Sequence, residues 1–124
     1  MNKKTILIFD DDVNILELCS IVLSESGYHV EISETSHDII EKVAKTSPDV
    51  ILMDNWIPDI GGIKATQLLK NDPQFHHIPV IYFSANNDIH ILAETAGADA
   101  YLSKPFDLND LENIVSEIIL KSKD

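Results

Sequence analysis

Short apolar runs that end in charged side chains recur along this chain. Three of them are TILIF at 5–9 before Asp10–Asp12, VILM at 50–53 before Asp54, and AYLS at 100–103 before Lys104. If these runs are parallel strands of one sheet, their charged groups meet at its carboxyl edge, which is where open α/β sheets bind ligands. Several carboxylates and one lysine in one crevice favour a divalent cation and an anionic reactant.

The apolar runs alternate with amphipathic segments along the chain. Strands are predicted at 5–9, 29–33, 50–53, 80–83 and 100–102, and helices at about 13–26, 63–70, 89–96 and after Asp107. A further helix, ended by Pro48, has Thr35 or Ser36 as its expected N-cap. Helices between parallel strands, joined by right-handed crossovers, give an α/β fold. We therefore expect a single domain over residues 1–124, with a flavodoxin-like, doubly wound sheet of five parallel strands, (β/α)5.

Apolar spacing indicates which parts of these elements are buried. The first helix is expected to bury Ile15, Leu18, Cys19, Val22 and Leu23. Asp12 suits the N-cap of this helix, and Gly27 suits the position just after its end. The run at 50–53 is continuously apolar, as in a strand covered on both faces, whereas the run at 29–33 alternates and is expected to be more exposed.

Composition limits the class of protein. The chain has 124 residues, a formal net charge of −12 and nine cations that are all lysines. Without arginine or a long basic run, direct nucleic-acid binding is not expected, and an acidic surface repels anionic membranes. No apolar stretch approaches the roughly 20 residues that span a bilayer, and the N-terminus does not resemble a signal peptide. The single cysteine agrees with a cytoplasmic location.

The acidic residues fit a metal site. Asp10, Asp11 and Asp54 would lie close together, and like charges raise one another's pKa unless a cation is present. Mg²⁺ suits them because it is a hard ion that takes oxygen ligands. An acidic triplet after a strand is also typical of a solvated turn or a helix cap, and Asp12 fits that role. Asp54 and Lys104 at other strand ends favour the metal site.

Asp54 is also a candidate nucleophile. It follows an apolar strand and precedes a loop that contains proline and glycine. A carboxylate in that position can attack phosphorus and form an aspartyl phosphate. Phosphoryl transfer then needs mainly positioning and charge neutralisation, which Lys104 can supply. The Ser84 hydroxyl at the end of the run 80–83 can donate a hydrogen bond to a phosphoryl oxygen, although this signal is weak alone.

Over essentially its whole length the chain resembles the receiver domain of bacterial two-component response regulators, either stand-alone or excised from a longer regulator. The resemblance depends on short motifs in a fixed order: Asp10-Asp11, Asp54, Ser84-Ala85, Gly97-Ala98-Asp99, Tyr101 and Lys104-Pro105-Phe106. Each motif is short, but together and in order they are highly specific for the family.

The resemblance implies a function for each of these residues. Asp54 is the expected acceptor of a phosphoryl group from a phosphohistidine of a sensor histidine kinase or a histidine phosphotransfer protein. Asp11 and Asp54 are expected to ligate Mg²⁺, with Mn²⁺ as a substitute, Asp10 acting mostly through water and the backbone carbonyl of Trp56 as a further ligand.

The same resemblance implies how the domain signals. Ser84 and Lys104 are expected to contact the phosphoryl oxygens, and Tyr101 is the expected switch aromatic. The helix at 89–96, the strand after it and the last helix would then change their binding to an unknown output protein or attached output domain. Such a chain is not a metabolic enzyme, but it catalyses its own phosphorylation and dephosphorylation.

Two other functions share parts of this pattern. A small metal-dependent phosphohydrolase of the haloacid-dehalogenase type would use Asp10 as its nucleophile, but the chain is short for that fold with a substrate cap, and Asn14 stands where a small Thr or Val is usual. A flavin-binding domain of similar topology would need a phosphate loop after the first strand, where this chain has acidic residues instead. Which aspartate becomes phosphorylated, Asp54 or Asp10, separates the first alternative from the receiver.

Overall fold

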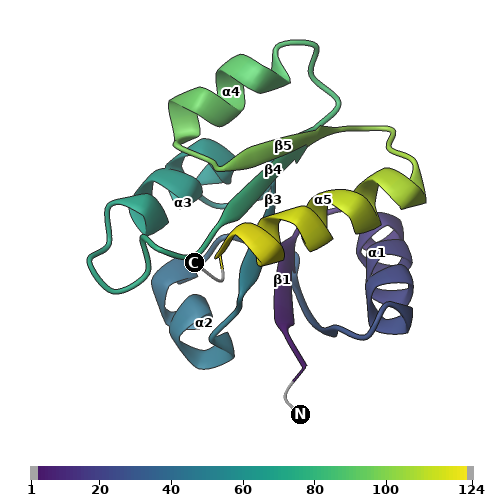
Figure 1. Ribbon diagram of the computed structural model, residues 1–124. Helices are drawn as coiled ribbons and strands as arrows, with labels where there is room; N and C mark the ends of the chain where they lie inside the picture. Colours follow the sequence, from purple (N-terminus) through teal and green to yellow (C-terminus); the bar gives the residue numbers. More distant parts are fainter. Residues whose placement is uncertain (1–2, 123–124) are drawn as a thin grey trace.

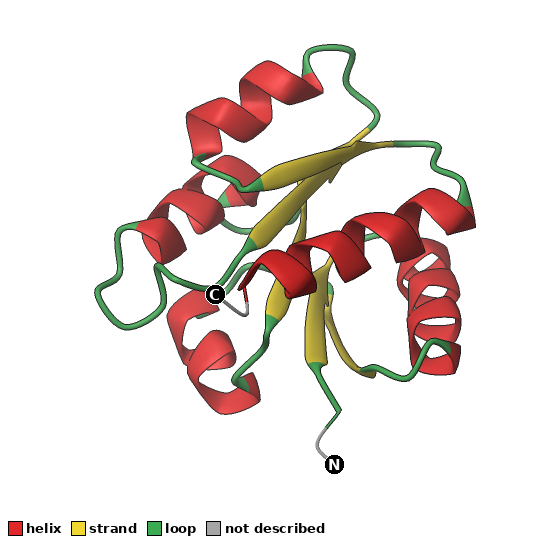
Figure 2. Ribbon diagram, viewed as in Figure 1, coloured by secondary structure: helices red, strands yellow, loops and turns green. Residues whose placement is uncertain are grey.

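Five parallel strands form one sheet with helices between them (Figures 1 and 2). The computed structural model describes residues 3–122. The strands are β1 (Thr5–Phe9), β2 (His29–Ser33), β3 (Val50–Asp54), β4 (Val80–Ser84) and β5 (Ala100–Ser103), in the spatial order β2-β1-β3-β4-β5. The helices are α1 (Val13–Glu25), α2 (Ile39–Thr46), α3 (Gly61–Lys70), α4 (Ile89–Ala96) and α5 (Leu108–Ser122). The predicted doubly wound, flavodoxin-like (β/α)5 fold is confirmed.

Helices cover both faces of the sheet. Helices α1 and α5 lie on one side, and α2, α3 and α4 lie on the other (Figure 1). Side chains alternate along each strand, so that Ile6 and Ile8 of β1 enter the core under α1 and α5, whereas Leu7 and Phe9 enter the other core. Strands β3 and β4 are buried throughout because both of their faces are covered, while β2 at the edge is largely exposed, as its alternating sequence predicts.

The register of the sheet brings the strand ends together. Phe9 of β1 pairs with Met53 of β3, so the next residue after each of them, Asp10 and Asp54, lies at the same edge of the sheet. Ser84 pairs with Ser103, so Lys104 follows at that edge too, and its N–H donates to the Ser84 carbonyl at 2.9 Å. All four positions therefore lie at the carboxyl edge of the sheet.

Helix α1 is rotated relative to its predicted orientation. Its buried residues are Leu16, Cys19 and Leu23, while Leu18 is 42% exposed, so the prediction of a buried Leu18 is wrong. Apolar residues surround much of this helix, and its sequence therefore fits more than one buried stripe. The predicted ends hold better, because the Asp12 carboxylate accepts hydrogen bonds from the N–H groups of Asn14 and Ile15.

The start of α2 also differs from the prediction. The helix begins at Ile39 after Asp38, whose φ is 53° and whose side chain makes no capping hydrogen bond, so neither Thr35 nor Ser36 is the N-cap. The Ser36 hydroxyl is buried and donates instead to the carbonyl of Pro58 in the loop between β3 and α3. The Ser36 side chain, which the local sequence assigns to the helix cap, therefore makes a tertiary contact instead.

No helix within residues 3–122 combines the length and the apolar character needed to cross a membrane.

Candidate functional site

A lysine bridges two buried aspartates at the carboxyl edge. The Lys104 Nζ lies 2.7 Å from Oδ2 of Asp10, at the end of β1, and 2.8 Å from Oδ1 of Asp54, at the end of β3. Both aspartates are almost completely buried. The ammonium also lies 4.6 Å from the centre of the Phe83 ring, which further favours a positive charge there. The sheet thus brings together three of the residues that the sequence singled out.

The two aspartates are held in the same way. The second carboxylate oxygen of Asp10 accepts the N–H of Asp12 at 2.9 Å, and the second oxygen of Asp54 accepts the N–H of Trp56 at 3.2 Å. Each carboxylate therefore has one oxygen on the lysine and the other on the backbone two residues further along the chain. These short-range bonds are typical of aspartates at turns. They fix the orientation of both carboxylates.

Burial and charge act together at this site. Burial raises the pKa of the Asp10 carboxyl above its ordinary value, although the hydrogen bond from Lys104 acts in the opposite direction. Burial alone would lower the pKa of Lys104, but its hydrogen bonds to Asp10 and Asp54 outweigh that effect, and the pKa is raised. The lysine therefore stays charged, and the carboxylates still favour binding of a further cation.

The acidic cluster fits a divalent cation. Asp10, Asp11 and Asp54 each offer a carboxylate oxygen, and these atoms lie within 4.8 Å of one another. Asp11 is exposed, so the cluster opens to solvent on that side. Lys104 contacts only two of the three carboxylates, Asp10 and Asp54, so with all three ionised the cluster has more negative than positive charge. Hard oxygen donors with this charge are what Mg²⁺ prefers in proteins.

Of the other predicted site residues, Ser84 and Trp56 lie beside this centre and Tyr101 does not. Ser84 is buried at the end of β4, and its hydroxyl accepts the N–H of Asn86 at 3.1 Å within its own loop. Trp56 contributes its backbone N–H to Asp54, while its indole is 74% exposed. Tyr101 is 47% exposed on β5 and lines a hollow between β5 and α4 with His90 and Glu94, and none of the three clustered aspartates lines that hollow.

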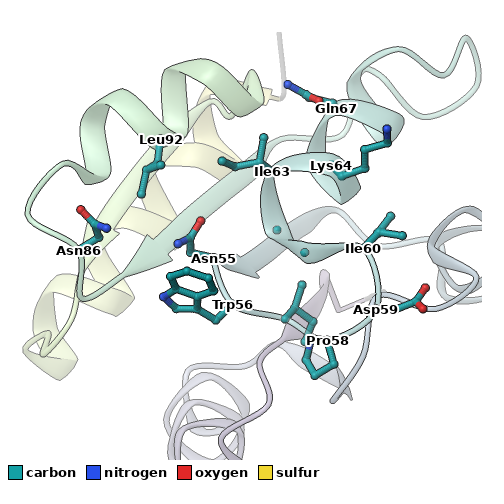
Figure 3. Close-up of a pocket in the computed structure, with 13 residues that line it drawn as sticks. Asn55, Trp56, Pro58, Asp59, Ile60, Ile63, Lys64, Gln67, Asn86 and Leu92 are labelled. Carbon is teal, nitrogen blue, oxygen red and sulfur yellow. The ribbon is translucent and has the colours of Figure 1, made fainter.

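A groove borders the site on the side of α3 and α4. Its volume is about 610 Å³, and its walls include Trp56, Pro58, Ile63, Asn86 and Leu92 (Figure 3). Neither Asp54 nor Lys104 lines the groove. The groove is therefore a neighbour of the acidic centre and not the place where its charged groups meet.

Sequence reasoning missed two residues that support Asp54. The hydroxyl of Tyr82, in the middle of β4, donates a hydrogen bond to the side-chain oxygen of Asn55, directly after Asp54. Gly62, at the start of α3, lies against the backbone of Asp54 and Asn55, with no room for a side chain. A tyrosine in an otherwise apolar strand is a usable signal, because a buried hydroxyl usually finds a partner.

Comparison with known proteins agrees with this geometry. The sequence profile of the response regulator receiver domain matches residues 6–116. The chain belongs to the response regulator receiver domain family. It is thus a receiver domain of the kind found in two-component signal transduction.

Individual relatives extend this comparison. The chain is 31% identical over 108 residues to the polar-differentiation response regulator DivK of Brucella ovis, covering 85% of this chain and 86% of that protein. It is 30% identical over 118 residues to the CAI-1 autoinducer sensor kinase/phosphatase CqsS of Vibrio cholerae, covering 93% of this chain but 17% of that protein. Among solved structures, a CheY-like receiver domain protein of Methanospirillum hungatei has a TM-score of 0.88 at 28% identity, with 98% of each chain covered.

Several relatives are much longer than this chain. The chain spans 17% of CqsS and about half, 49%, of the phosphate regulon regulator PhoB of Pseudomonas aeruginosa. Receiver domains of this family therefore occur both alone and as parts of larger proteins. Membership of the family therefore does not assign the activity or the partners of those larger proteins to this chain.

Proposed function

We propose that this receiver domain is a phosphorylation switch in which Asp54 accepts a phosphoryl group from a phosphohistidine of a sensor histidine kinase or a histidine phosphotransfer protein. The observation that supports it is the pair of hydrogen bonds from Lys104 to Asp10 and Asp54, beside the carboxylate of Asp11. This arrangement keeps a carboxylate nucleophile next to a fixed positive charge and a cation site. Phosphoryl transfer requires those parts.

Phosphoryl transfer to Asp54 exchanges a phosphorus–nitrogen bond for a phosphorus–oxygen bond. An oxygen of the Asp54 carboxylate forms a bond to phosphorus while the phosphorus–nitrogen bond of the phosphohistidine breaks. The bonding electrons leave with the imidazole, which holds a proton on its other ring nitrogen and so leaves as neutral histidine, and Asp54 becomes an acyl phosphate. Lys104 is available to pair with an oxygen of the transferred group, and the Ser84 hydroxyl can donate to another after it releases the N–H of Asn86.

The proposed reaction requires a bound divalent cation. Mg²⁺, or Mn²⁺ in its place, would be held by Asp10, Asp11 and Asp54, with the backbone carbonyl of Trp56 as the ligand that the family resemblance adds. When bound, the ion supplies positive charge that offsets the repulsion between the carboxylates and an incoming phosphoryl group.

The proposed output follows from Ser84 and Tyr101. Movement of Ser84 toward the phosphoryl group would draw the loop after β4 inward and let the exposed Tyr101 ring turn toward the space that it leaves. The surface formed by α4, β5 and α5 would then change its affinity for an output protein or an attached domain. We propose that the receiver domain extends over residues 1–124 and is located in the cytoplasm. We also propose that it makes no direct contact with nucleic acid or membrane.

The test is to locate the phosphoryl group. The protein is incubated with Mg²⁺ and acetyl phosphate, and then with a phosphohistidine donor, and the adduct is followed by intact mass and peptide mapping. We expect one adduct on Asp54, which is lost in Asp54→Asn and retained in Asp59→Asn, a change of an exposed aspartate five residues away. An adduct on Asp10 would instead support the phosphohydrolase, and no adduct with any donor would contradict the proposal.

A further inference from the structure

The residue after Asp54 is tied to the neighbouring strand by its side chain. Tyr82 lies fully buried in β4, and its hydroxyl donates a hydrogen bond to Oδ1 of Asn55. Burial and the negative charge of Asp54 raise the pKa of the Tyr82 hydroxyl, so it keeps its proton and remains a donor. The two residues are 27 positions apart in the sequence, and the bond joins β4 to the loop that carries Trp56.

Asn55 is also held by its backbone on both sides. Its N–H donates to the carbonyl of Phe83 at 3.2 Å, and its carbonyl accepts the N–H of Gly62 at 3.1 Å. That carbonyl shares one planar peptide unit with the N–H of Trp56, the group that donates to Oδ2 of Asp54. A turn of Asn55 would therefore move the Trp56 N–H away from the Asp54 carboxylate.

The two aspartates of the site differ in what supports this backbone donor. The N–H on Asp10 belongs to Asp12, which is the N-cap of α1 and is held by the helix. The N–H that donates to Asp54 belongs to Trp56, which lies in a loop. The indole of Trp56 is exposed and borders the groove (Figure 3). Asp54 therefore depends on other contacts to keep this loop in place.

We propose that Tyr82 and Asn55 are positioning residues for Asp54: their hydrogen bond fixes the Asn55–Trp56 peptide, and through its N–H the orientation of the Asp54 carboxylate toward the divalent cation and the phosphoryl donor. This inference rests on the proposed function of Asp54 as the phosphoacceptor. It assigns a role at the site to a buried core tyrosine whose hydroxyl bonds to Asn55 and not to an aspartate of the cluster.

The simpler explanation is that Asn55 only satisfies a buried hydroxyl. On that explanation, removal of the bond lowers the free energy of unfolding but leaves Mg²⁺ binding and phosphorylation unchanged. The positioning role instead predicts that both properties of Asp54 change with the bond. Stability alone does not separate the two explanations, so the experiment must measure the site.

The experiment is a double-mutant cycle. Tyr82→Phe removes only the hydroxyl, Asn55→Ala removes its acceptor, and the double variant removes both. Tyr28→Phe serves as the matched control, because Tyr28 is a partly buried tyrosine that packs against the opposite core. Each protein is titrated with Mg²⁺ by calorimetry, phosphorylated with acetyl phosphate, and unfolded with urea. The amide resonance of Trp56 is followed by NMR without metal.

We expect each single variant to weaken Mg²⁺ binding about tenfold, as is typical for loss of a group that orients a metal ligand. The double variant should bind no more weakly than either single variant, because all three lack the same bond. The Trp56 amide resonance should shift in the same direction in all three, and Tyr28→Phe should retain the affinity and rate of the parent.

Two results would overturn the inference. One is a Tyr82→Phe variant with lower stability but parental Mg²⁺ affinity, phosphorylation rate and Trp56 resonance. The other is additive effects in the double variant, which would mean that the residues act separately. If the parent itself neither binds Mg²⁺ nor is phosphorylated at Asp54, the proposed function has failed, and the positioning role fails with it. If Tyr82→Phe does not fold, the same criteria apply to Asn55→Ala.

Discussion

At the scale of single residues, Gly62 shows how closely α3 approaches the phosphoacceptor. A Cβ on Gly62 would overlap the carbonyl oxygen of Asp54 and lie 3.0 Å from the Cα of Asn55. Both neighbours are backbone atoms of a strand end and a tied loop, so they cannot move aside as the end of a flexible side chain can. The first turn of α3 begins two residues earlier than predicted, and this glycine allows its close contact with β3.

We predict that Gly62→Ala lowers the free energy of unfolding by about 2–3 kcal/mol, although alanine is the better helix former. It should also weaken Mg²⁺ binding, because relief of the overlap displaces the backbone of Asp54. Urea unfolding and a Mg²⁺ titration provide the measurements. Gly61→Ala is the comparison: its φ of 83° strains alanine, but no atom lies within 4 Å of the added Cβ, so Mg²⁺ binding should remain. Equal Mg²⁺ affinities for the parent and Gly62→Ala would show that the contact does not position Asp54.

At the scale of elements, two loops are joined beside the site. The carbonyl of Pro58, between β3 and α3, accepts the N–H of Ser36 at 3.0 Å and its hydroxyl at 2.7 Å. The Ser36 hydroxyl in turn accepts the N–H of Ile60 at 3.1 Å. The loop after Asp54 is thus tied to β4 at its start by Asn55, and to the loop between β2 and α2 at its end.

We predict that Ser36→Ala lowers the free energy of unfolding by about 1–3 kcal/mol, because it removes a buried hydroxyl that bonds both to the Pro58 carbonyl and to the Ile60 N–H. Hydrogen exchange should also become faster at Ile60. The matched control is Ser47→Ala, which removes an exposed hydroxyl whose contact to Ala44 is 3.5 Å long, and it should change stability by less than about 0.5 kcal/mol. A Ser36→Ala variant as stable as Ser47→Ala would contradict the idea that this bond joins the loops.

At the scale of the whole molecule, charge opposes folding. The net charge of −12 favours expansion through self-repulsion, and the cluster of Asp10, Asp11 and Asp54 concentrates part of that charge at the sheet edge. General screening by salt should relieve the first effect. A bound divalent cation should relieve the second in addition, because it binds the folded state only.

We predict that MgCl₂ stabilises the protein more than NaCl at equal ionic strength, by about 1.4 kcal/mol when Mg²⁺ is at ten times its dissociation constant. Thermal or urea unfolding in the two salts measures the difference. Asp11→Asn should remove most of the difference, while Asp59→Asn, outside the cluster, should retain it. Identical curves in the two salts would mean that the acidic cluster does not bind the ion in the folded state.

Much of the fold and of the candidate site follows from the sequence alone. Alternating apolar and amphipathic segments predict the five β-α units, because each segment's periodicity depends on neighbouring residues. Since parallel strands end at one edge, the positions of Asp10, Asp54 and Lys104 after their apolar runs also predict that these residues meet there. The structure brings those three together.

Tertiary packing decided the remainder. The buried face of α1, the loss of Ser36 as a cap, and the bond from Tyr82 to Asn55 all depend on which surfaces meet after the chain has folded. A helix with apolar residues around much of its circumference fits several buried stripes, and a hydroxyl can bond to any partner that packing brings near. Local periodicity carries no information about such distant partners. Local patterns are therefore enough to predict which groups gather at the edge of the sheet, whereas the contacts that hold Asp54 in place among them depend on packing between distant segments.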